Sequence, residues 1–191
     1  FCTVNRSLFE YFHLASMPVF AKFTALSHKS DYNNSRRSVT AMQNINAQLI
    51  VAGRIRNHSM SDYAESFSIL KNQGKLVADI KYITNEKRDL YFKSADVIVL
   101  PYTKIYQSGV MLMAMSYGIP VVASDLQPNR ELVNEIDCVE FFRVGDHLML
   151  EKVVSSLLAN SERRYVLRKN CFSVLENSHN WIKIATNFKQ L

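Results

Sequence analysis

A chain of 191 residues is long enough for one sizeable domain, or for one domain plus a fragment. Hydrophobic residues make up 48% of it, which is ample for a core and excludes a disordered chain. The formal net charge is +6, of which residues 1–60 carry +5 and residues 61–191 only +1. Such a basic segment could favour an anionic membrane surface or nucleic acid. A solvated basic segment is the commoner explanation, and we expect no nucleic-acid partner.

Cysteine and histidine usage argues against two further classes of protein. The three cysteines, Cys2, Cys138 and Cys171, include no CxxC pair and indicate reduced thiols, not a disulfide framework or a zinc site. The five histidines show no ligand spacing, so no metal is expected. No apolar run is long enough to span a membrane, and no signal peptide is evident. We therefore expect a cytoplasmic location, with peripheral contact at the inner membrane face as an open alternative.

The N-terminal part has no clear fold signal. Residues 1–46 are predicted to be an N-terminal fragment or linker of uncertain fold, and residues 47–191 a domain. Because the chain starts at Phe1 and not at Met, we expect it to be a fragment or an observed segment of a longer protein. Residues 47–52, AQLIVA, predict a buried strand, and Gly53-Arg54 follows at its carboxyl edge.

The next elements alternate in type. Residues 61–73 predict a helix, and residues 77–83 predict a strand. Thr84 or Asn85 can cap the helix that begins at Glu86, whose acidic side chain suits a first turn.

Residues 94–125 predict one complete β-loop-α-β unit. Residues 97–100, VIVL, form a continuous apolar run that is typical of a strand buried on both faces of a parallel sheet. Residues 110–117 are apolar on nearly every face and predict a buried helix, which Gly118 can end in the left-handed conformation. Residues 121–123 give the second strand.

The turn before this buried helix carries the functional signal. Ser108 is a good helix N-cap, and Gly109 lets a ligand approach the backbone without a side chain in the way. The first amides of a helix have no partner inside it, and its dipole places partial positive charge there. The turn therefore predicts a phosphate or diphosphate site. An ordinary capped crossover helix that binds nothing explains the local pattern equally well.

The rest of the chain continues the alternation. Residues 139–144 predict a strand, and residues 150–158 predict an amphipathic helix. Ser161 can cap another helix, with Leu167 and Cys171 facing inward. Strands that alternate with helices predict an α/β fold: a Rossmann-like parallel sheet with helices on both faces.

The run ADVIVLPYTKIYQSGVMLMAMSYGIPVVASD, followed by Glu131-Leu132-Val133, resembles the donor-binding half of family 4 (group 1) glycosyltransferases. These are two-domain GT-B enzymes that transfer a sugar from a nucleotide diphosphate, and the resemblance implies their C-terminal donor-binding domain. It extends from about Ala47 to the C-terminus, although its specific part is confined to residues 94–133. The family's usual opening strand, glycine turn and basic residue are not identified before Ala47.

One departure from the family concerns its two signature glutamates, which are separated by seven residues. Those positions here hold Ile105 and Met113. In the family pattern the second glutamate is associated with the nucleotide ribose and the first with the donor sugar. Isoleucine and methionine cannot accept hydrogen bonds from hydroxyls as carboxylates do. Donor binding must therefore use other groups, or it has been weakened or lost.

The residues and the resemblance together predict a donor-binding site, whereas no catalytic residue is assigned. Ser108 and Gly109 are the expected diphosphate cradle, and Tyr106 and Gln107 are expected to shape the sugar pocket. The full predicted set comprises Gly53, Arg54, Ile83, Thr84, Lys104, Tyr106, Gln107, Ser108, Gly109, Val110 and Glu131.

Several members of this set have an alternative interpretation. Arg54 and Lys104 are weaker candidates for phosphate charge, and a surface arginine after a strand is equally consistent with the pattern. By resemblance Ile83 and Thr84 lie near the nucleotide base, although Tyr82 and Ile83 could equally be core residues. Glu131 fits a family glutamate, or it could be a first-turn acid that interacts with a helix dipole.

By analogy with the family, the reaction retains anomeric configuration and needs no metal or other cofactor. The expected partners are a nucleotide sugar and a saccharide or lipid-linked acceptor. The acceptor domain is expected to be missing or incomplete, so the isolated chain should transfer sugar poorly or not at all. The alternative is a non-catalytic GT-B-like partner or scaffold module, which the missing glutamates favour. A nicotinamide-dependent Rossmann domain ranks low because no GxGxxG is present.

Overall fold

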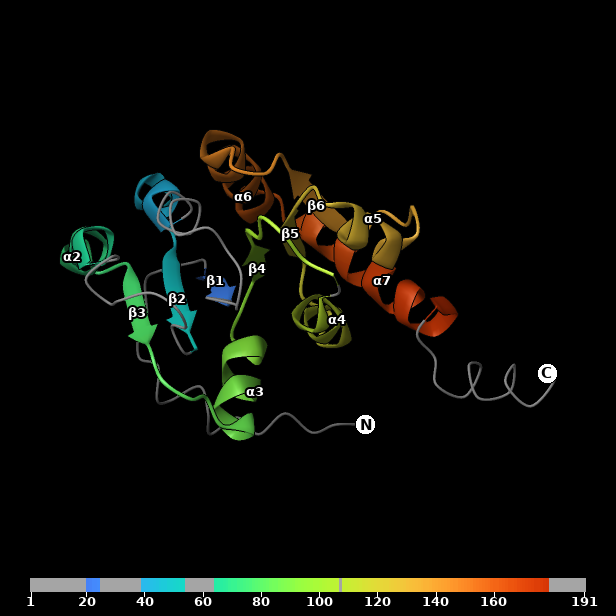
Figure 1. The fold of residues 1–191 in the computed structure, drawn as a ribbon, viewed down its shortest axis with the longest axis horizontal. Helices are drawn as coiled ribbons and strands as arrows, with labels where there is room; N and C mark the ends of the chain where they lie inside the picture. Colours follow the sequence, from blue (N-terminus) through green and yellow to red (C-terminus); the bar gives the residue numbers. More distant parts are fainter. Residues whose placement is uncertain (1–19, 25–38, 54–63, 107, 179–191) are drawn as a thin grey trace.

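The computed structural model describes residues 39–53, 64–106 and 108–178, together with the backbone of residues 20–24. These residues form one sheet of six parallel strands in the order β3-β2-β1-β4-β5-β6 (Figure 1). The strands are β1 (Phe20–Thr24), β2 (Gln48–Ala52), β3 (Leu76–Asp79), β4 (Val97–Leu100), β5 (Val121–Ser124) and β6 (Val139–Phe142). The predicted Rossmann-like parallel sheet is confirmed.

Strand β1 corrects the expected organisation of the N-terminal part. It lies between β2 and β4, with Phe20 opposite Gln48 and Ala21 opposite Val97. Residues 1–46 therefore contribute a central strand, and the boundary expected before residue 47 does not separate β1 from the sheet. The sequence did not reveal this strand because five residues with a lysine at the centre carry little hydrophobic pattern. Its place is specified by pairing with two distant strands, β2 and β4.

In the described residues, six helices and one short 3-10 helix accompany the strands, and the last two of the helices follow the last strand. They are η2 (Met42–Asn44), α2 (Ala64–Asn72), α3 (Asn85–Lys93), α4 (Gly109–Ser116), α5 (Gln127–Val133), α6 (His147–Ala159) and α7 (Ser161–Ser178). The helices predicted near residues 86, 110, 150 and 161 are all present. Two strands are shorter than predicted: β3 ends at Asp79 and β6 at Phe142. No helix among these residues is long and apolar enough to cross a membrane.

The central strands are buried on both faces, as their unbroken apolar runs predict. In β4, Val97 and Val99 belong to one hydrophobic cluster, whereas Ile98 and Leu100 belong to the other. All four side chains are fully buried. The two clusters lie on opposite faces because successive side chains of a strand point to opposite sides. Helices must therefore cover both faces, which is the arrangement that a parallel sheet requires.

Helix α4 is fixed at its C-terminal end by neighbouring helices, and Figure 1 shows α4 and α7 side by side. Gly118 follows the helix in the left-handed conformation, with φ of 64°. Its carbonyl accepts a hydrogen bond of 2.8 Å from Arg168 Nε of α7. Tyr117 donates a hydrogen bond of 2.5 Å to Asp89 of α3. Both contacts join the C-terminal end of α4 to neighbouring helices, α7 and α3.

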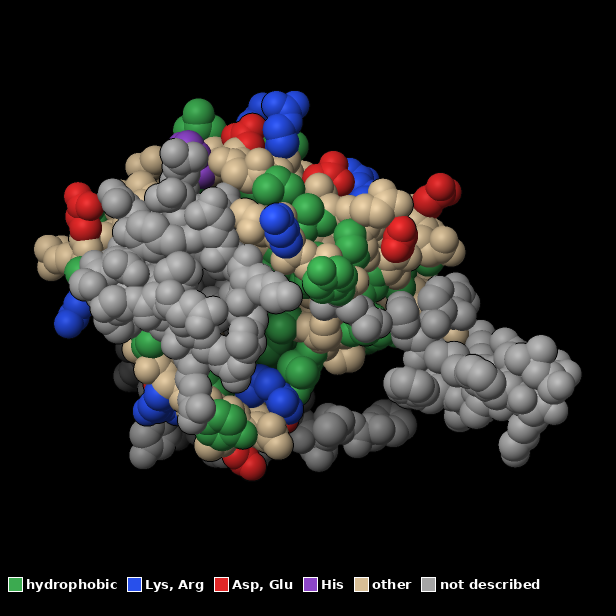
Figure 2. All heavy atoms as spheres, viewed as in Figure 1, with side chains coloured by type: hydrophobic (Ala, Val, Ile, Leu, Met, Phe, Trp, Pro, Cys, Tyr) green, Lys and Arg blue, Asp and Glu red, His purple; other side chains and the backbone are tan. Residues whose placement is uncertain are grey.

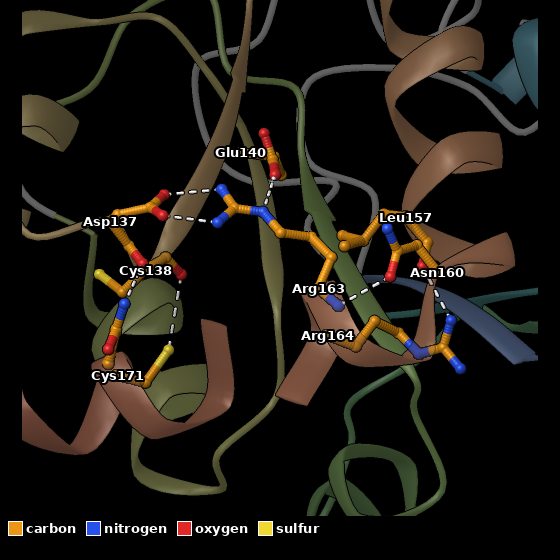
Figure 3. Close-up of polar contacts among 9 residues, drawn as sticks. Asp137, Cys138, Glu140, Leu157, Asn160, Arg163, Arg164 and Cys171 are labelled. Atoms are coloured by element: carbon orange, nitrogen blue, oxygen red, sulfur yellow. Dashed lines mark hydrogen bonds and ion pairs between the residues drawn. The ribbon is translucent and has the colours of Figure 1, made fainter. Parts of the chain in front are cut away.

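A charge cluster joins α7 to β6 on the side where β6 begins (Figure 3). The Arg163 guanidinium binds both oxygens of Asp137 at 2.5 and 2.6 Å, and its Nε donates to Glu140 at 2.7 Å. This bidentate pairing holds the pKa of the Asp137 carboxyl below its ordinary value. Close by, the buried thiols of Cys138 and Cys171 are free, and Cys171 Sγ lies 3.6 Å from the Cys138 carbonyl.

Candidate functional site

The strand order identifies where a ligand would bind. The chain runs from β1 outward to β3 on one side and then returns to form β4, on the other side of β1. An open α/β sheet of this order binds its ligands outside the carboxyl ends of the strands, at the point where the direction of winding changes. That point lies between β1 and β4. The loop that leaves β4 and leads into α4 lies at this point.

The loop between β4 and α4 exposes polar side chains and packs apolar ones against the core. Tyr102 is buried, and Ile105 packs against the cluster that contains Ile98 and Leu100. Lys104 is exposed, and the Tyr106 side chain is 89% exposed. Two of the predicted site residues thus project from the loop at the ligand-binding edge.

Helix α4 begins with the predicted N-cap at Ser108. The buried Ser108 hydroxyl accepts a hydrogen bond of 3.1 Å from the Met111 amide, as an N-cap does. Within the described residues, no acceptor is assigned to the amides of Gly109 or Val110. A Cβ atom built on Gly109 would have no heavy atom within 4 Å. Two amides therefore lie next to open space at the positive end of a helix dipole.

The other predicted residues occupy the same edge of the sheet. Gly53 follows β2 with φ of 138°, and a Cβ atom there would also meet open space. The Thr84 hydroxyl caps α3, accepting from the Lys87 amide at 3.4 Å. Ile83 is half-buried, whereas Tyr82 is 63% exposed, so the alternative that Tyr82 is a core residue is wrong.

The remaining predicted residues are Arg54, Gln107 and Glu131. Arg54 and Gln107 lie outside the described residues. Glu131 is exposed and accepts a hydrogen bond of 2.9 Å from Gln127. Because α5 begins at Gln127, Glu131 lies beyond the first turn, and its interpretation as a first-turn acid is wrong.

The two positions that hold glutamate in the family pattern are part of the hydrophobic packing. Ile105 and Met113 are both partly buried and pack against the cluster around β4 and β5. They stabilise the loop and the helix by packing against this cluster, but they supply no acceptor for a hydroxyl group. Polar contacts to a ligand would therefore have to come from the backbone of α4 and from neighbouring loops.

Asp79 is a polar residue of this edge that sequence reasoning missed. It ends β3, and its side chain is only 12% exposed. The carboxylate accepts hydrogen bonds from Lys87 Nζ at 2.7 Å and from the Tyr91 hydroxyl at 2.8 Å, and Lys81 Nζ lies 3.2 Å away. The hydrogen bond from Lys87 is the main reason that the pKa of Asp79 falls to about 2. The strand was predicted to continue to Ile83, which placed Asp79 in mid-strand and concealed its role.

Comparison with known proteins agrees with this architecture. The structure resembles sucrose-phosphate synthase from Thermosynechococcus elongatus, with a TM-score of 0.71 and 22% identity over 92% of this chain and 45% of that one. Anabaena HepE, solved in complex with UDP and glucose, gives a TM-score of 0.73 and 15% identity over 98% of this chain and 53% of that one. This chain thus spans about half the length of these proteins.

A shorter structure matches over most of its own length. It is the C-terminal domain of LpcC, a group 1 family glycosyl transferase from Francisella tularensis, with a TM-score of 0.71 and 13% identity over 86% of this chain and 89% of that domain. No curated protein sequence matches this chain significantly.

The fold is that of a GT-B half-domain. Residues 33–160 match the family model described as glycosyl transferases group 1. This match covers more than half of the chain, and the chain belongs to that family.

Proposed function

We propose that this chain is the donor-binding domain of a glycosyltransferase that uses a nucleoside-diphosphate sugar. The observation that carries the proposal is the start of α4, where the Gly109 and Val110 amides lie beside open space at the ligand-facing edge. A diphosphate placed there would accept hydrogen bonds from these amides and would meet the positive end of the helix dipole. Family membership supports the same assignment.

These groups would act on the bond that breaks. As the sugar departs, negative charge develops on the diphosphate leaving group. Fixed amides that already point at this charge lower the barrier, because the protein does not reorganise during the reaction. Lys104 is placed on the same loop to add positive charge. By family analogy, the transfer retains anomeric configuration and uses no metal.

The rest of the enzyme would lie outside this domain. The chain spans about half the length of sucrose-phosphate synthase and HepE, so we place the acceptor site, and any base, in a second domain. We propose a saccharide or lipid-linked acceptor, and in the lipid-linked case a peripheral contact with the membrane. We expect the isolated chain to transfer sugar poorly or not at all.

One observation favours a second candidate, a non-catalytic partner or scaffold of the same fold. Ile105 and Met113 leave two positions of the site apolar where the family pattern has carboxylates. A domain that no longer binds a donor could retain such residues, because they contribute to the packing of the loop. The open backbone at Gly109 opposes this candidate, since a scaffold has no need of it.

Calorimetry on three versions of the chain would separate these candidates. The wild type, Gly109→Val and Ser116→Val would each be titrated with UDP-, GDP-, ADP- and TDP-linked sugars at millimolar concentration. Gly109 has room for a side chain, so its replacement should leave folding intact while blocking access to the amides. Ser116 is exposed at the other end of the same helix and serves as the matched control.

We expect the wild type and Ser116→Val to bind at least one nucleotide sugar with the same affinity, and Gly109→Val to bind it at least tenfold more weakly. Absence of binding by the wild type to every nucleotide sugar would contradict the proposal and favour the scaffold. Equal binding by Gly109→Val would show that the donor lies elsewhere.

A further inference from the structure

We propose that Asp79 is a positioning residue for nucleotide binding: its carboxylate holds residues 80–84 in place at the ligand-facing edge of the sheet, where its backbone carbonyl also binds the Gly53 amide. The inference rests on the proposed function and adds a residue to it. Asp79 itself would not contact the nucleotide. It would act through the backbone of residues 80–84, which include Ile83 and Thr84.

The Asp79 side chain connects both ends of the segment that follows β3. Lys81, near the start of this segment, lies 3.2 Å from one carboxylate oxygen. Lys87 and Tyr91 bind the other oxygen at 2.7 and 2.8 Å, and both belong to α3, which begins directly after Thr84. Residues 80–84 are therefore held at both ends by one carboxylate.

The Asp79 backbone extends the same junction to the neighbouring strand. Its carbonyl accepts a hydrogen bond of 3.1 Å from the Gly53 amide, the first residue after β2. It also accepts one of 3.1 Å from the Lys81 amide, which turns the chain away from the sheet. The register of the strands places Asp79 opposite Ala52. A single residue thus connects the ends of two strands, the segment after β3 and helix α3.

Charge makes this junction dependent on the ionised carboxylate. The charged and titratable side chains that contact the Asp79 carboxylate are Lys81, Lys87 and Tyr91, and two of them are cations. Figure 2 shows Lys and Arg side chains gathered at the end of the molecule where α3 lies. In Asp79→Asn, a neutral amide would replace the carboxylate. The ammonium groups of Lys81 and Lys87 would then repel each other without a negative charge between them, and every side-chain contact of residue 79 would weaken. The segment would then lose its fixed conformation while the strands keep theirs.

The matched control, Asp137, lies at the opposite end of the strands, where they begin. Asp137 precedes β6 and forms a bidentate pair with Arg163 at 2.5 and 2.6 Å. Asp137→Asn removes a carboxylate from an ion-pair cluster, as Asp79→Asn does, but at the edge where the strands begin. A general loss of stability would therefore affect both variants, whereas a positioning role would affect only Asp79→Asn.

The experiment combines two measurements on the wild type, Asp79→Asn, Tyr91→Phe and Asp137→Asn. Affinities for UDP, GDP, ADP and TDP give both the binding strength and the discrimination between bases. Amide hydrogen exchange of peptides that contain residues 80–84 reports the order of the segment without any ligand. Tyr91→Phe removes the hydroxyl that donates to Asp79 and keeps the test available if Asp79→Asn fails to fold.

We expect Asp79→Asn to bind the preferred nucleotide at least fivefold more weakly, to discriminate less between bases, and to exchange faster at residues 80–84. Tyr91→Phe should show smaller changes in the same direction, and Asp137→Asn none. Unchanged exchange in the Asp79 and Tyr91 variants would overturn the inference whether or not a nucleotide binds. Faster exchange with unchanged affinity and discrimination would overturn it too. Absence of nucleotide binding by the wild type would refute the proposed function, and with it the positioning role.

Discussion

The two ends of helix α4 meet different surroundings. At its start, Gly109 faces open space, and the first amides have no assigned acceptor among the described residues. At its end, Gly118 lies against α7, so that a Cβ atom there would be 2.8 Å from Phe172 Cζ. The glycines at the two ends of this helix therefore differ: Gly109 borders open space, and Gly118 leaves room for a neighbouring helix.

The two edges of the sheet repeat this contrast. Where the strands end, Asp79 is bound by partners from the segment and the helix that follow β3. Where β6 begins, Asp137 and Arg163 join elements that are distant in the sequence. The difference teaches that similar ion pairs can hold a loop at one end of the strands and join packed elements at the other. Four changes test this contrast.

The largest effect is expected from Gly118→Ala. Alanine is strained at a φ of 64°, and its Cβ would press on Phe172. We expect the free energy of unfolding to fall by about 2 kcal/mol, measured by chemical denaturation. Gly74→Ala is the control, because Gly74 has a φ of 68° and nothing within 4 Å, so it isolates the backbone strain. Equal losses for the two variants would show that the contact with α7 contributes nothing.

The stabilisation that the Asp79 carboxylate contributes to the fold should depend on pH. Its folded pKa, about 2, is lower than the ordinary value of 3.8, so its stabilisation is complete above about pH 4 and is lost as the pH falls towards 2. At neutral pH we expect the wild type to be more stable than Asp79→Asn by about 1.5 kcal/mol. Denaturation curves between pH 2 and 7 should show the difference shrinking only below about pH 4. A constant difference would contradict the assigned role of the charge.

Removal of the Ser108 hydroxyl should cost about 1 kcal/mol, because the Met111 amide loses its cap. Asp146→Ala removes an equivalent cap from α6, where the carboxylate accepts from the Met149 amide at 2.9 Å. Thermal and chemical unfolding should show similar losses for the two variants. Only Ser108→Ala should also weaken nucleotide binding. Weaker binding by both variants would mean that the effect follows stability and not the site.

The smallest effect on stability is expected from Gly109→Ala. The added methyl group meets no atom and no strained backbone, so the free energy of unfolding should change by less than about 0.5 kcal/mol. Differential scanning calorimetry would measure this directly. A large loss would mean that Gly109 is required by the fold, and the contrast with Gly118 would disappear.

Much of the central unit could be predicted from short-range patterns. The run at residues 97–100 was expected to be buried on both faces, and all four side chains are. The helix after Ser108, its cap and the turn at Gly118 also lie where the sequence placed them. Such features depend on hydrophobic runs and on residues with restricted backbone or capping preferences, which act over a few positions of the chain.

Other features depended on contacts between distant residues. Strand β1 owes its central place to pairing with β2 and β4, which lie 28 and 76 residues further along by the partners of Phe20 and Ala21. Asp79 owes its role to Lys87 and Tyr91, which reach it only because α3 folds back beside the end of β3. A residue's own neighbours in the chain carry no record of such partners. Local chemistry therefore specified the strands and helices, and the packing of the whole sheet specified which polar groups meet at its edge.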